Sequence, residues 1–352
     1  MNIRDAIAHV VDRHDLTLTD MTAVMRQIMA GEATPAQIAG LLVALRQKGE
    51  SVDEITAAAC VMRELSVKVE VDVAPLIDTC GTGGDSSGTF NISTATAFVV
   101  AAGGGYVAKH GNRSVSSASG SADLLEAAGA RLALTPANIS RCIREVGFGF
   151  MFAQAHHGAT RHAAGPRREL GIRTLFNVLG PLTNPATPPL QLVGLFNRDW
   201  VPRIAEVLLR LGSQRALVVH ATDGLDEISI GAPTLVAELQ GGVITHYEIN
   251  PAQLGIRAAS LDTLKVLNVE ESLTRIRAVF ENVAGPARDI VALNAGAALY
   301  LCGLSTDLVE GYQRALELIA SGAARARFER FIALTQALAE PDHHGATTCP
   351  PK

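Results

Sequence analysis

The sequence lacks an excess of basic residues. Its 352 residues include 30 Lys and Arg against 35 Asp and Glu, which gives a formal net charge of −5, and only 18% of the residues are charged. A protein that binds nucleic acid through its phosphates needs a cluster of basic residues to do so. The composition therefore predicts no nucleic-acid partner, and any basic site must be local.

Cysteine is scarce and scattered. The number is odd and no Cys-x-x-Cys spacing occurs, which argues against both a disulfide framework and a structural zinc site. A reducing, cytoplasmic location fits best. Cys80 stands beside a glycine-rich segment, but no cation or base in its local sequence would lower its thiol pKa, so we expect a packed residue rather than a nucleophile. The five cysteines are Cys60, Cys80, Cys142, Cys302 and Cys349.

A long apolar run is also missing. No stretch reaches the roughly 18 uninterrupted apolar residues that a membrane-spanning helix needs. The first residues show helical spacing instead, with Ile3, Ile7, Val10 and Val11 on one face. We therefore expect no signal peptide, no membrane contact and a mature soluble protein.

The first part of the chain carries explicit helix signals. Thr34-Pro-Ala-Gln37 and Ser51-Val-Asp-Glu54 each combine an N-cap hydroxyl with an amide or carboxylate three residues later. Gly31 and Gly49 stand where helices should stop. These signals predict a small all-helical domain over residues 1–70.

From about residue 73 short apolar strands alternate with helices, which predicts an α/β fold. A further strand is expected at 216–219, and a hairpin at 235–239 and 243–249 around Gly241-Gly242 predicts an antiparallel part of the same sheet. The fold class is thus a small helical domain plus a large α/β domain with a central mixed, mostly parallel sheet. The earlier elements are expected at Pro75–Thr79, Ser93–Ala102, Tyr106–Ala108, Ser121–Ala128 and Pro136–Val146.

The segment Asp78-Thr-Cys-Gly-Thr-Gly-Gly-Asp85 reads as strand, glycine loop and helix. Glycines let the main chain turn tightly and present bare N–H groups to a phosphate, and the next helix adds its positive end. Ser93 or Thr94 could cap that helix and offer a hydroxyl. The alternative for the loop alone is an ordinary tight turn.

A second polar turn follows the strand expected at 106–108. Lys109-His-Gly-Asn-Arg-Ser-Val-Ser-Ser117 carries two cations with several hydroxyls and amides, which suits an anion or a sugar. Two such cradles at successive strand ends suggest one substrate with two phosphate groups, because ligands of these sheets collect beyond the carboxyl ends of strands.

An acidic turn follows the strand at 216–219. Asp223, Asp226 and Glu227 are close in sequence. Mg²⁺ prefers one or two carboxylates and takes further oxygens from substrate phosphates, so the turn could hold that ion. A solvated acidic turn is the alternative reading, and the two phosphate cradles make it the weaker one.

A histidine-rich stretch, His156 to His162, precedes a helix expected over Pro166–Asn177 and ended by Gly180-Pro181. The histidine spacings are not those of zinc sites, and no cysteine or carboxylate lies close by, so we do not expect a metal here.

Seven ordered motifs together resemble the anthranilate phosphoribosyltransferases, a family of the nucleoside phosphorylase-like class. The resemblance implies transfer of a phosphoribosyl group from 5-phosphoribosyl 1-diphosphate to the amine of anthranilate, in tryptophan biosynthesis, by a homodimer joined through its helical domain. The motifs are Gly81-Thr-Gly-Gly-Asp85, Asn91-Ile-Ser-Thr94, Lys109-His-Gly-Asn112, Ser119-Gly-Ser-Ala-Asp123, Arg167-Arg-Glu-Leu-Gly171, Phe176-Asn-Val-Leu-Gly-Pro-Leu-Thr-Asn-Pro185 and Asp226-Glu227.

The resemblance also implies the domain division. A segment at about 166–188 would return to the helical domain, 71–165 and 189–340 would form the α/β domain that binds phosphoribosyl diphosphate, and Arg167 would face the glycine loop across a cleft. The polar, proline-containing residues 341–352 are expected to be a loose tail.

Site residues follow from the same resemblance. Mg²⁺ would lie on Ser93, Asp226 and Glu227, the acceptor would meet Gly81, Asn112 and Arg167, and Lys109 with the acidic pair would assist departure of diphosphate. His110 is the nearest titratable candidate to take the amine proton, with water as the alternative. The donor would be held by Gly81, Gly84, Asp85, Thr89, Asn91, Ile92, Ser93, Thr94, Lys109, His110, Gly111, Asn112, Arg113, Ser114, Val115, Ser116, Ser117 and Ser121.

Two other functions are compatible with an α/β fold of this class. A pyrimidine nucleoside phosphorylase would share the fold class but needs neither the acidic pair Asp226-Glu227 nor a diphosphate cradle of this size. A nucleic-acid-binding relative would have lost the motifs and gained a basic surface. The sequence favours the transferase over both.

Overall fold

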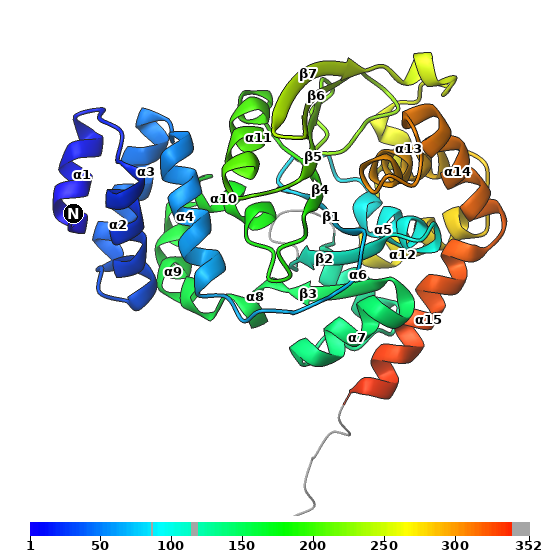
Figure 1. Cartoon of the computed structure of the whole chain (residues 1–352), viewed down its shortest axis with the longest axis horizontal. Helices are drawn as coiled ribbons and strands as arrows, with labels where there is room; N and C mark the ends of the chain where they lie inside the picture. Colours follow the sequence, from blue (N-terminus) through cyan, green and yellow to red (C-terminus); the bar gives the residue numbers. More distant parts are fainter. Residues whose placement is uncertain (86, 114–118, 340–352) are drawn as a thin grey trace, which may run out of the picture.

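Four amino-terminal helices form a bundle at one end of the molecule (Figure 1). The computed structural model describes residues 1–85, 87–113 and 119–339. Both expected capping boxes are confirmed, at Thr34 with Gln37 and at Ser51 with Glu54. Gly31 ends its helix in the left-handed conformation, at a φ of 77°. The helices are α1 (Ile3–Val11), α2 (Leu18–Ala30), α3 (Pro35–Lys48) and α4 (Val52–Glu64).

A later segment packs on this bundle. Helix α9 (Arg161–Leu170) contacts α2 and α3, and the short helix α10 (Phe176–Leu179) contacts α4. The single helix expected over 166–177 is therefore wrong. Gly171 takes a left-handed φ of 60° and ends α9, and the chain turns before α10 begins.

Seven strands form one sheet in the order β3-β2-β1-β4-β5-β6-β7. The first five in that order run parallel, and β6 and β7 are antiparallel, which confirms the mixed, mostly parallel sheet. The hairpin turn falls at Gly241-Gly242, both with positive φ. The strands are β1 (Leu76–Gly81), β2 (Tyr106–Gly111), β3 (Phe148–Phe152), β4 (Leu190–Gly194), β5 (Arg215–Ala221), β6 (Thr234–Gln240) and β7 (Val243–Ile249).

Helices cover both faces of the sheet. Buried α13 packs with α5 and α14 on one side, and α11 lies on the other side between the sheet and α4 (Figure 1). One apolar core joins the bundle, α11 and one sheet face, and another fills the opposite face. These helices are α5 (Ile92–Ala102), α6 (Ser121–Ala127), α7 (Pro136–Val146), α8 (Ala153–His156), α11 (Val201–Arg210), α12 (Val269–Phe280), α13 (Pro286–Leu301), α14 (Leu308–Ala320) and α15 (Ala323–Leu338).

Two local expectations need correction. Strand β2 runs on to Gly111, so Lys109 and His110 stand in the strand rather than in the turn after it. Helix α5 begins at Ile92 after Asn91 and has no side-chain cap, so neither Ser93 nor Thr94 is its N-cap. No helix in the described ranges is both long enough and apolar enough to cross a lipid bilayer.

Candidate active site

The carboxyl ends of the parallel strands bring the glycine loop and the acidic turn together. The Gly83 N–H donates a hydrogen bond of 2.8 Å to Asp226 Oδ2, across 143 positions of sequence. A Cβ on Gly81 would lie 2.3 Å from that same oxygen, and one on Gly194 would lie 1.5 Å from the Asp226 carbonyl oxygen. Glycine is therefore required at the ends of β1 and β4 so that the acidic turn can approach.

Lys109, near the carboxyl end of β2, is a buried cation. Only 2% of its surface is exposed. Its Nζ donates to the Thr79 carbonyl at 2.5 Å and to Ser93 Oγ at 3.1 Å, and it forms no ion pair within the described residues. Both partners are neutral, so the ammonium is held in place with its charge available to an anionic ligand.

Three carboxylates share the other side of the site. Burial, and then the charge of Asp85, raise the pKa of Asp226. Burial, and then the charge of Asp226, raise the pKa of Glu227, whose carboxylate also accepts a hydrogen bond from Ser93. The Asp85 Oδ2 atom is buried and has no hydrogen-bond partner in the described residues. This crowding of oxygen ligands fits a hard cation such as Mg²⁺.

The described side chains do not form a complete metal site. No group of three or more His, Cys, Asp or Glu side chains in the described ranges is arranged to hold a metal by itself. Mg²⁺ usually takes several of its oxygens from water and substrate phosphates, so the lack of such a group does not argue against one or two carboxylates as its protein ligands.

A buried hydrogen-bond network fixes the strand ends beneath the site. Asn184 Nδ2 donates to Asp78 Oδ2 and to the Ala108 carbonyl, both at 2.8 Å. The His110 N–H donates to Asp78 Oδ1 at 3.4 Å. Sequence reasoning assigned no role to Asp78 or Asn184, because partners 106 residues apart leave no local signal.

Two neutral histidines form one wall. The His110 and His157 rings lie 5.1 Å apart in an edge-to-face arrangement. Burial lowers the pKa of His110 to about 3 and that of His157 to about 4. The Nδ1 atom of His110 lies 3.1 Å from the Gly180 carbonyl, which can only accept, so Nδ1 carries the proton and Nε2 is free to accept one. Sequence reasoning missed His157, although it named the histidine-rich stretch.

Arg167 projects from α9 and is half-buried. Its guanidinium carbon lies 5.0 Å from the Phe176 ring centroid, and burial lowers its pKa. It forms no ion pair with any described residue. The Arg173 guanidinium lies next to the glycine loop, with its Nη2 3.4 Å from the Cβ position of Gly84.

The other residues that the sequence predicts for substrate binding have contacts within the protein. Asn91 accepts from the Ser119 and Ser272 hydroxyls at 2.7 and 2.8 Å, and Asn112 accepts at Oδ1 from the Arg113 N–H. Arg113 is engaged elsewhere, since it pairs with Asp123 and Glu126. Thr89 bridges to the chain at Lys265, Thr94 is buried, and Ser121 begins α6. Ser114, Val115, Ser116 and Ser117 lie outside the described residues, as does the tail 341–352.

Cys80, beside the glycine loop, is a buried thiol whose pKa is raised well above its usual range, first by burial. This confirms a packed residue rather than a nucleophile.

Comparison with known proteins identifies the class first. The helical bundle domain of the glycosyl transferase family matches residues 4–66, and the α/β domain of that family matches residues 73–325. The chain thus belongs to this glycosyl transferase family, and within it to the anthranilate phosphoribosyltransferases.

The relatives support that placement over the whole chain. The anthranilate phosphoribosyltransferase of Thioalkalivibrio sulfidiphilus is 58% identical over 95% of this chain and 99% of its own. That of Alkalilimnicola ehrlichii is 59% identical over 96% and 99%. The crystal structure of the Thermus thermophilus enzyme is 45% identical and has a TM-score of 0.89 over 94% of this chain and 99% of its own. The Saccharomyces cerevisiae enzyme, solved with phosphoribosyl diphosphate and Mg, is 24% identical with a TM-score of 0.87 over 96% and 98%, a likeness that shows the fold.

Proposed function

We propose that this protein transfers the phosphoribosyl group of 5-phosphoribosyl 1-diphosphate to the amine of anthranilate, releasing diphosphate, in tryptophan biosynthesis. The observation that carries the proposal is Lys109, a buried ammonium without a carboxylate partner in the described residues, set where the glycine loop meets Asp226. Membership of the family supplies the identity of the two substrates.

The site residues divide between the substrates. The loop N–H groups from Gly81 to Gly84 and the ammonium of Lys109 would hold the diphosphate, whose negative charge grows as its bond to C1 breaks. Arg167 would bind the carboxylate of anthranilate by a charge-assisted contact and so aim the amine at C1. No covalent enzyme nucleophile is needed.

The acidic pair and Ser93 would hold Mg²⁺, which supplies charge neutralisation at the diphosphate when it is bound. The support in this chain is the crowding of Asp85, Asp226 and Glu227, with one buried Asp85 oxygen unpartnered in the described residues. Removal of Mg²⁺ with a chelator should abolish turnover.

The amine proton has a nearby acceptor in His110. Its Nε2 is buried and without a partner among the described residues, and its tautomer leaves that atom able to accept. A pKa of about 3 makes His110 a weak base. It would accept the amine proton only after the new C–N bond has made that proton acidic, and water could take the same role.

The helical segments would act as one domain, residues 1–70 with the returning segment at about 166–188. The contacts of α9 with α2 and α3 support this division. The α/β domain would then comprise 71–165 and 189–340. The four described cysteines are free thiols, which is consistent with a cytoplasmic location.

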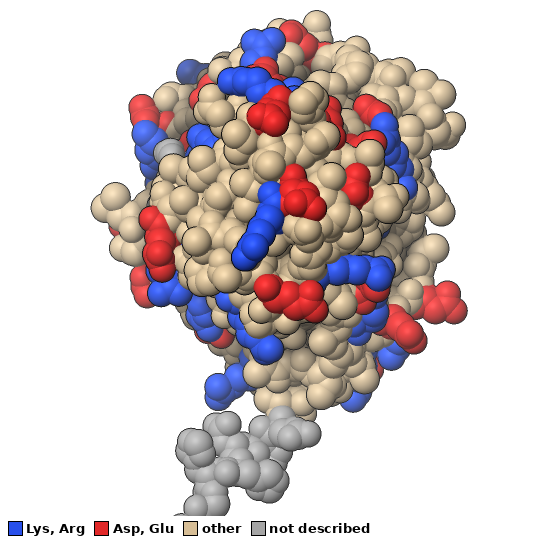
Figure 2. Space-filling view, turned by 90° about the vertical axis from the view of Figure 1, so that its left-hand side faces the viewer, with Lys and Arg blue, Asp and Glu red and all other residues tan. Residues whose placement is uncertain are grey.

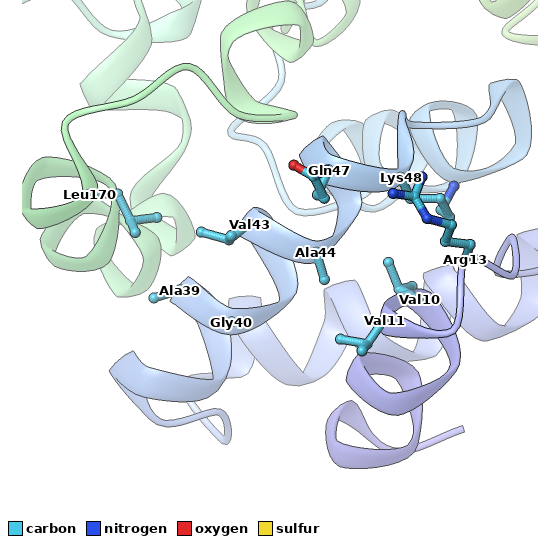
Figure 3. Close-up of a pocket in the computed structure, with 10 residues that line it drawn as sticks. All are labelled: Val10, Val11, Arg13, Ala39, Gly40, Val43, Ala44, Gln47, Lys48 and Leu170. Atoms are coloured by element: carbon cyan, nitrogen blue, oxygen red, sulfur yellow. The ribbon is translucent and has the colours of Figure 1, made fainter.

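A homodimer through the helical domain is also proposed. An apolar hollow of about 470 Å³ opens between α1, α3 and α9, with Val10, Val11, Val43 and Leu170 around it (Figure 3). Val11 is 63% exposed and Val43 is 41% exposed. On the face that carries the bundle, Figure 2 shows acidic and basic side chains interspersed among broad uncharged areas. Such a surface fits another copy of the chain better than nucleic acid.

The direct test is to mix the protein with phosphoribosyl diphosphate, Mg²⁺ and anthranilate and to follow the loss of anthranilate fluorescence. We expect Mg²⁺-dependent loss with release of one diphosphate per acceptor consumed. Failure of pure, folded protein to react would sink the proposal. Phosphate-dependent cleavage of a pyrimidine nucleoside without Mg²⁺ would establish the phosphorylase instead.

A further inference from the structure

A polar cleft lies between the helical bundle and the sheet, on the side of α11. It has a volume of about 680 Å³. Its walls come from the end of α3 and the turn before α4, from the link between α9 and α10 with α10 itself, and from the segment that follows β4 into α11. Figure 1 shows α10 and α11 between the bundle and the sheet. None of the residues proposed above for catalysis or substrate binding lines it.

Four arginines converge on this cleft: Arg46, Arg173, Arg198 and Arg203. None of them forms an ion pair with a carboxylate in the described part of the chain. Arg210, which lies on α11 outside the cleft, shows the contrast because it pairs with both Asp53 and Glu206.

The contacts that these arginines do make are with neutral groups. Arg46 donates to the Arg173 carbonyl, and Arg203 donates to the Glu50 carbonyl at 3.2 Å. The Arg173 guanidinium carbon lies 4.0 Å from the Phe196 ring centroid. Backbone and ring contacts orient the guanidinium groups but leave their charge uncompensated.

Acidic groups also line the cleft, and they do not balance it. Glu50 is buried, and burial raises the pKa of its carboxyl. Asp199 is exposed at the rim. Four guanidinium groups thus face two carboxyls.

We propose that this cleft binds a multivalent oxyanion, either a phosphate or a polycarboxylate, through Arg46, Arg173, Arg198 and Arg203. The planar guanidinium fork matches the oxygens of both chemistries in bidentate fashion. A bound anion ties α3 of the bundle to the start of α11. Arg173 also lies beside Gly84 of the glycine loop, so binding here couples to the donor half of the active site.

The chain carries its own reporter for this site. Trp200 is the only tryptophan in the sequence, and it lines the cleft. Wild-type protein is titrated with inorganic phosphate, and separately with citrate, while sodium chloride keeps the ionic strength constant and Trp200 fluorescence is followed. We expect a saturable change with at least one of the two anions, and the one that binds more tightly identifies the source.

Three variants locate the response. Arg46→Gln should weaken the apparent affinity at least about tenfold, as expected for loss of a charge-assisted contact. Arg210→Gln, a matched charge removal on α11, should leave it unchanged. Lys109→Met should also leave it unchanged, because that variant removes the anion-binding ammonium of the active site and nothing from the cleft.

The inference is overturned by a change that does not saturate, by equal weakening in the Arg46 and Arg210 variants, or by loss in Lys109→Met with retention in Arg46→Gln. The last result would place the anion in the active site. Because the readout is binding, an enzyme that fails the transferase assay but keeps a saturable Trp200 response leaves this inference standing.

Discussion

Lys109 shows how a single residue can be costly in the empty protein and useful in the complex. A buried ammonium loses its hydration, and neutral hydrogen-bond acceptors replace only part of it. Lys109 donates to the Thr79 carbonyl and the Ser93 hydroxyl, and it forms no direct ion pair within the described residues, although its charge acts on the carboxyls of Asp78 and Glu227. In the proposed complex the diphosphate would supply the missing negative charge, so a cost in stability at this position would become a gain in affinity.

Glu227 of the acidic pair is a partly buried acid, and its pKa leads to a prediction about stability. Burial and Asp226 raise the pKa of Glu227, so the wild-type carboxyl stabilises the fold below the ordinary glutamate pKa of 4.5 and loses that contribution as the pH rises through its folded-state pKa. Glu227→Gln cannot ionise. Without Mg²⁺, its Tm should match that of wild type near pH 4 and exceed it by about 2–4 °C near pH 8.

The same variant should lose activity although it gains stability. Turnover with saturating Mg²⁺ should fall roughly 100-fold, the typical cost of removing one electrostatic contact to a developing charge. Thermal melts across the pH range and initial rates check both halves. A variant with wild-type rates and no pH-dependent Tm gap would show that Asp226-Glu227 is only a solvated turn.

At the residue scale the sequence predicted the members of motifs and missed their partners across the fold. Gly83 and Asp226 were both flagged, and the structure joins them directly. Asp78 and Asn184 were not assigned roles, and Arg173 was overlooked beside Gly84. Motifs are local strings, whereas these contacts depend on which strand ends become neighbours, and that order is a property of the sheet.

Strand ends are the elements that assemble the site. Strands β1, β2, β4 and β5 run parallel, so their carboxyl ends share one edge and carry the glycine loop, Lys109 and the acidic turn to it. The acidic turn lies so close to β4 that a Cβ at Gly194 would overlap the backbone of Asp226 rather than its side chain.

Gly194→Ala tests that limit. Its Cβ would fall 1.5 Å from the Asp226 carbonyl oxygen, so the acidic turn must move by an ångström or more. Displacement of that size should lower kcat/KM for phosphoribosyl diphosphate about 100-fold. Gly158→Ala is the matched control, since a Cβ there meets nothing within 4 Å and its φ is not positive.

Steady-state kinetics at saturating Mg²⁺, with a melt to confirm folding, decide the matter. Equal activity of the two alanine variants would contradict the prediction, because it would mean that the acidic turn can shift without loss of activity.

Helices and turns were predicted correctly where capping residues or glycine pairs mark their ends. The capping boxes at Thr34 and Ser51 and the glycine hairpin at 241–242 are confirmed. The sequence prediction failed at 166–177, where Gly171 ends α9 in the left-handed conformation, a stop signal of the same kind as Gly31 that the prediction of one continuous helix passed over. Tertiary contacts with α2 and α3 hold this segment, and a sequence window does not contain them.

The whole molecule has a bundle whose outer face keeps apolar side chains in contact with solvent. Val43→Asp places a charge at the hollow between α1, α3 and α9, so it should convert the proposed dimer to a monomer. Val309→Asp, at a residue of α14 that is 49% exposed, should leave the dimer intact. Light scattering at micromolar concentration gives both masses. A monomeric wild type would contradict the proposed interface.

The central claim is the proposed division of the substrates: Arg167, on the helical side, would bind the acceptor, and the carboxyl ends of the strands would bind the donor. The most direct measurement is a set of steady-state kinetics on Arg167→Ala with each substrate varied in turn. The account predicts that kcat/KM for anthranilate falls at least about tenfold, as expected for loss of a charge-assisted contact. The apparent affinity for phosphoribosyl diphosphate should stay within about twofold. Equal weakening toward both substrates would contradict the account, because it would show that Arg167 supports the packing of α9 on Phe176 rather than the binding of one substrate.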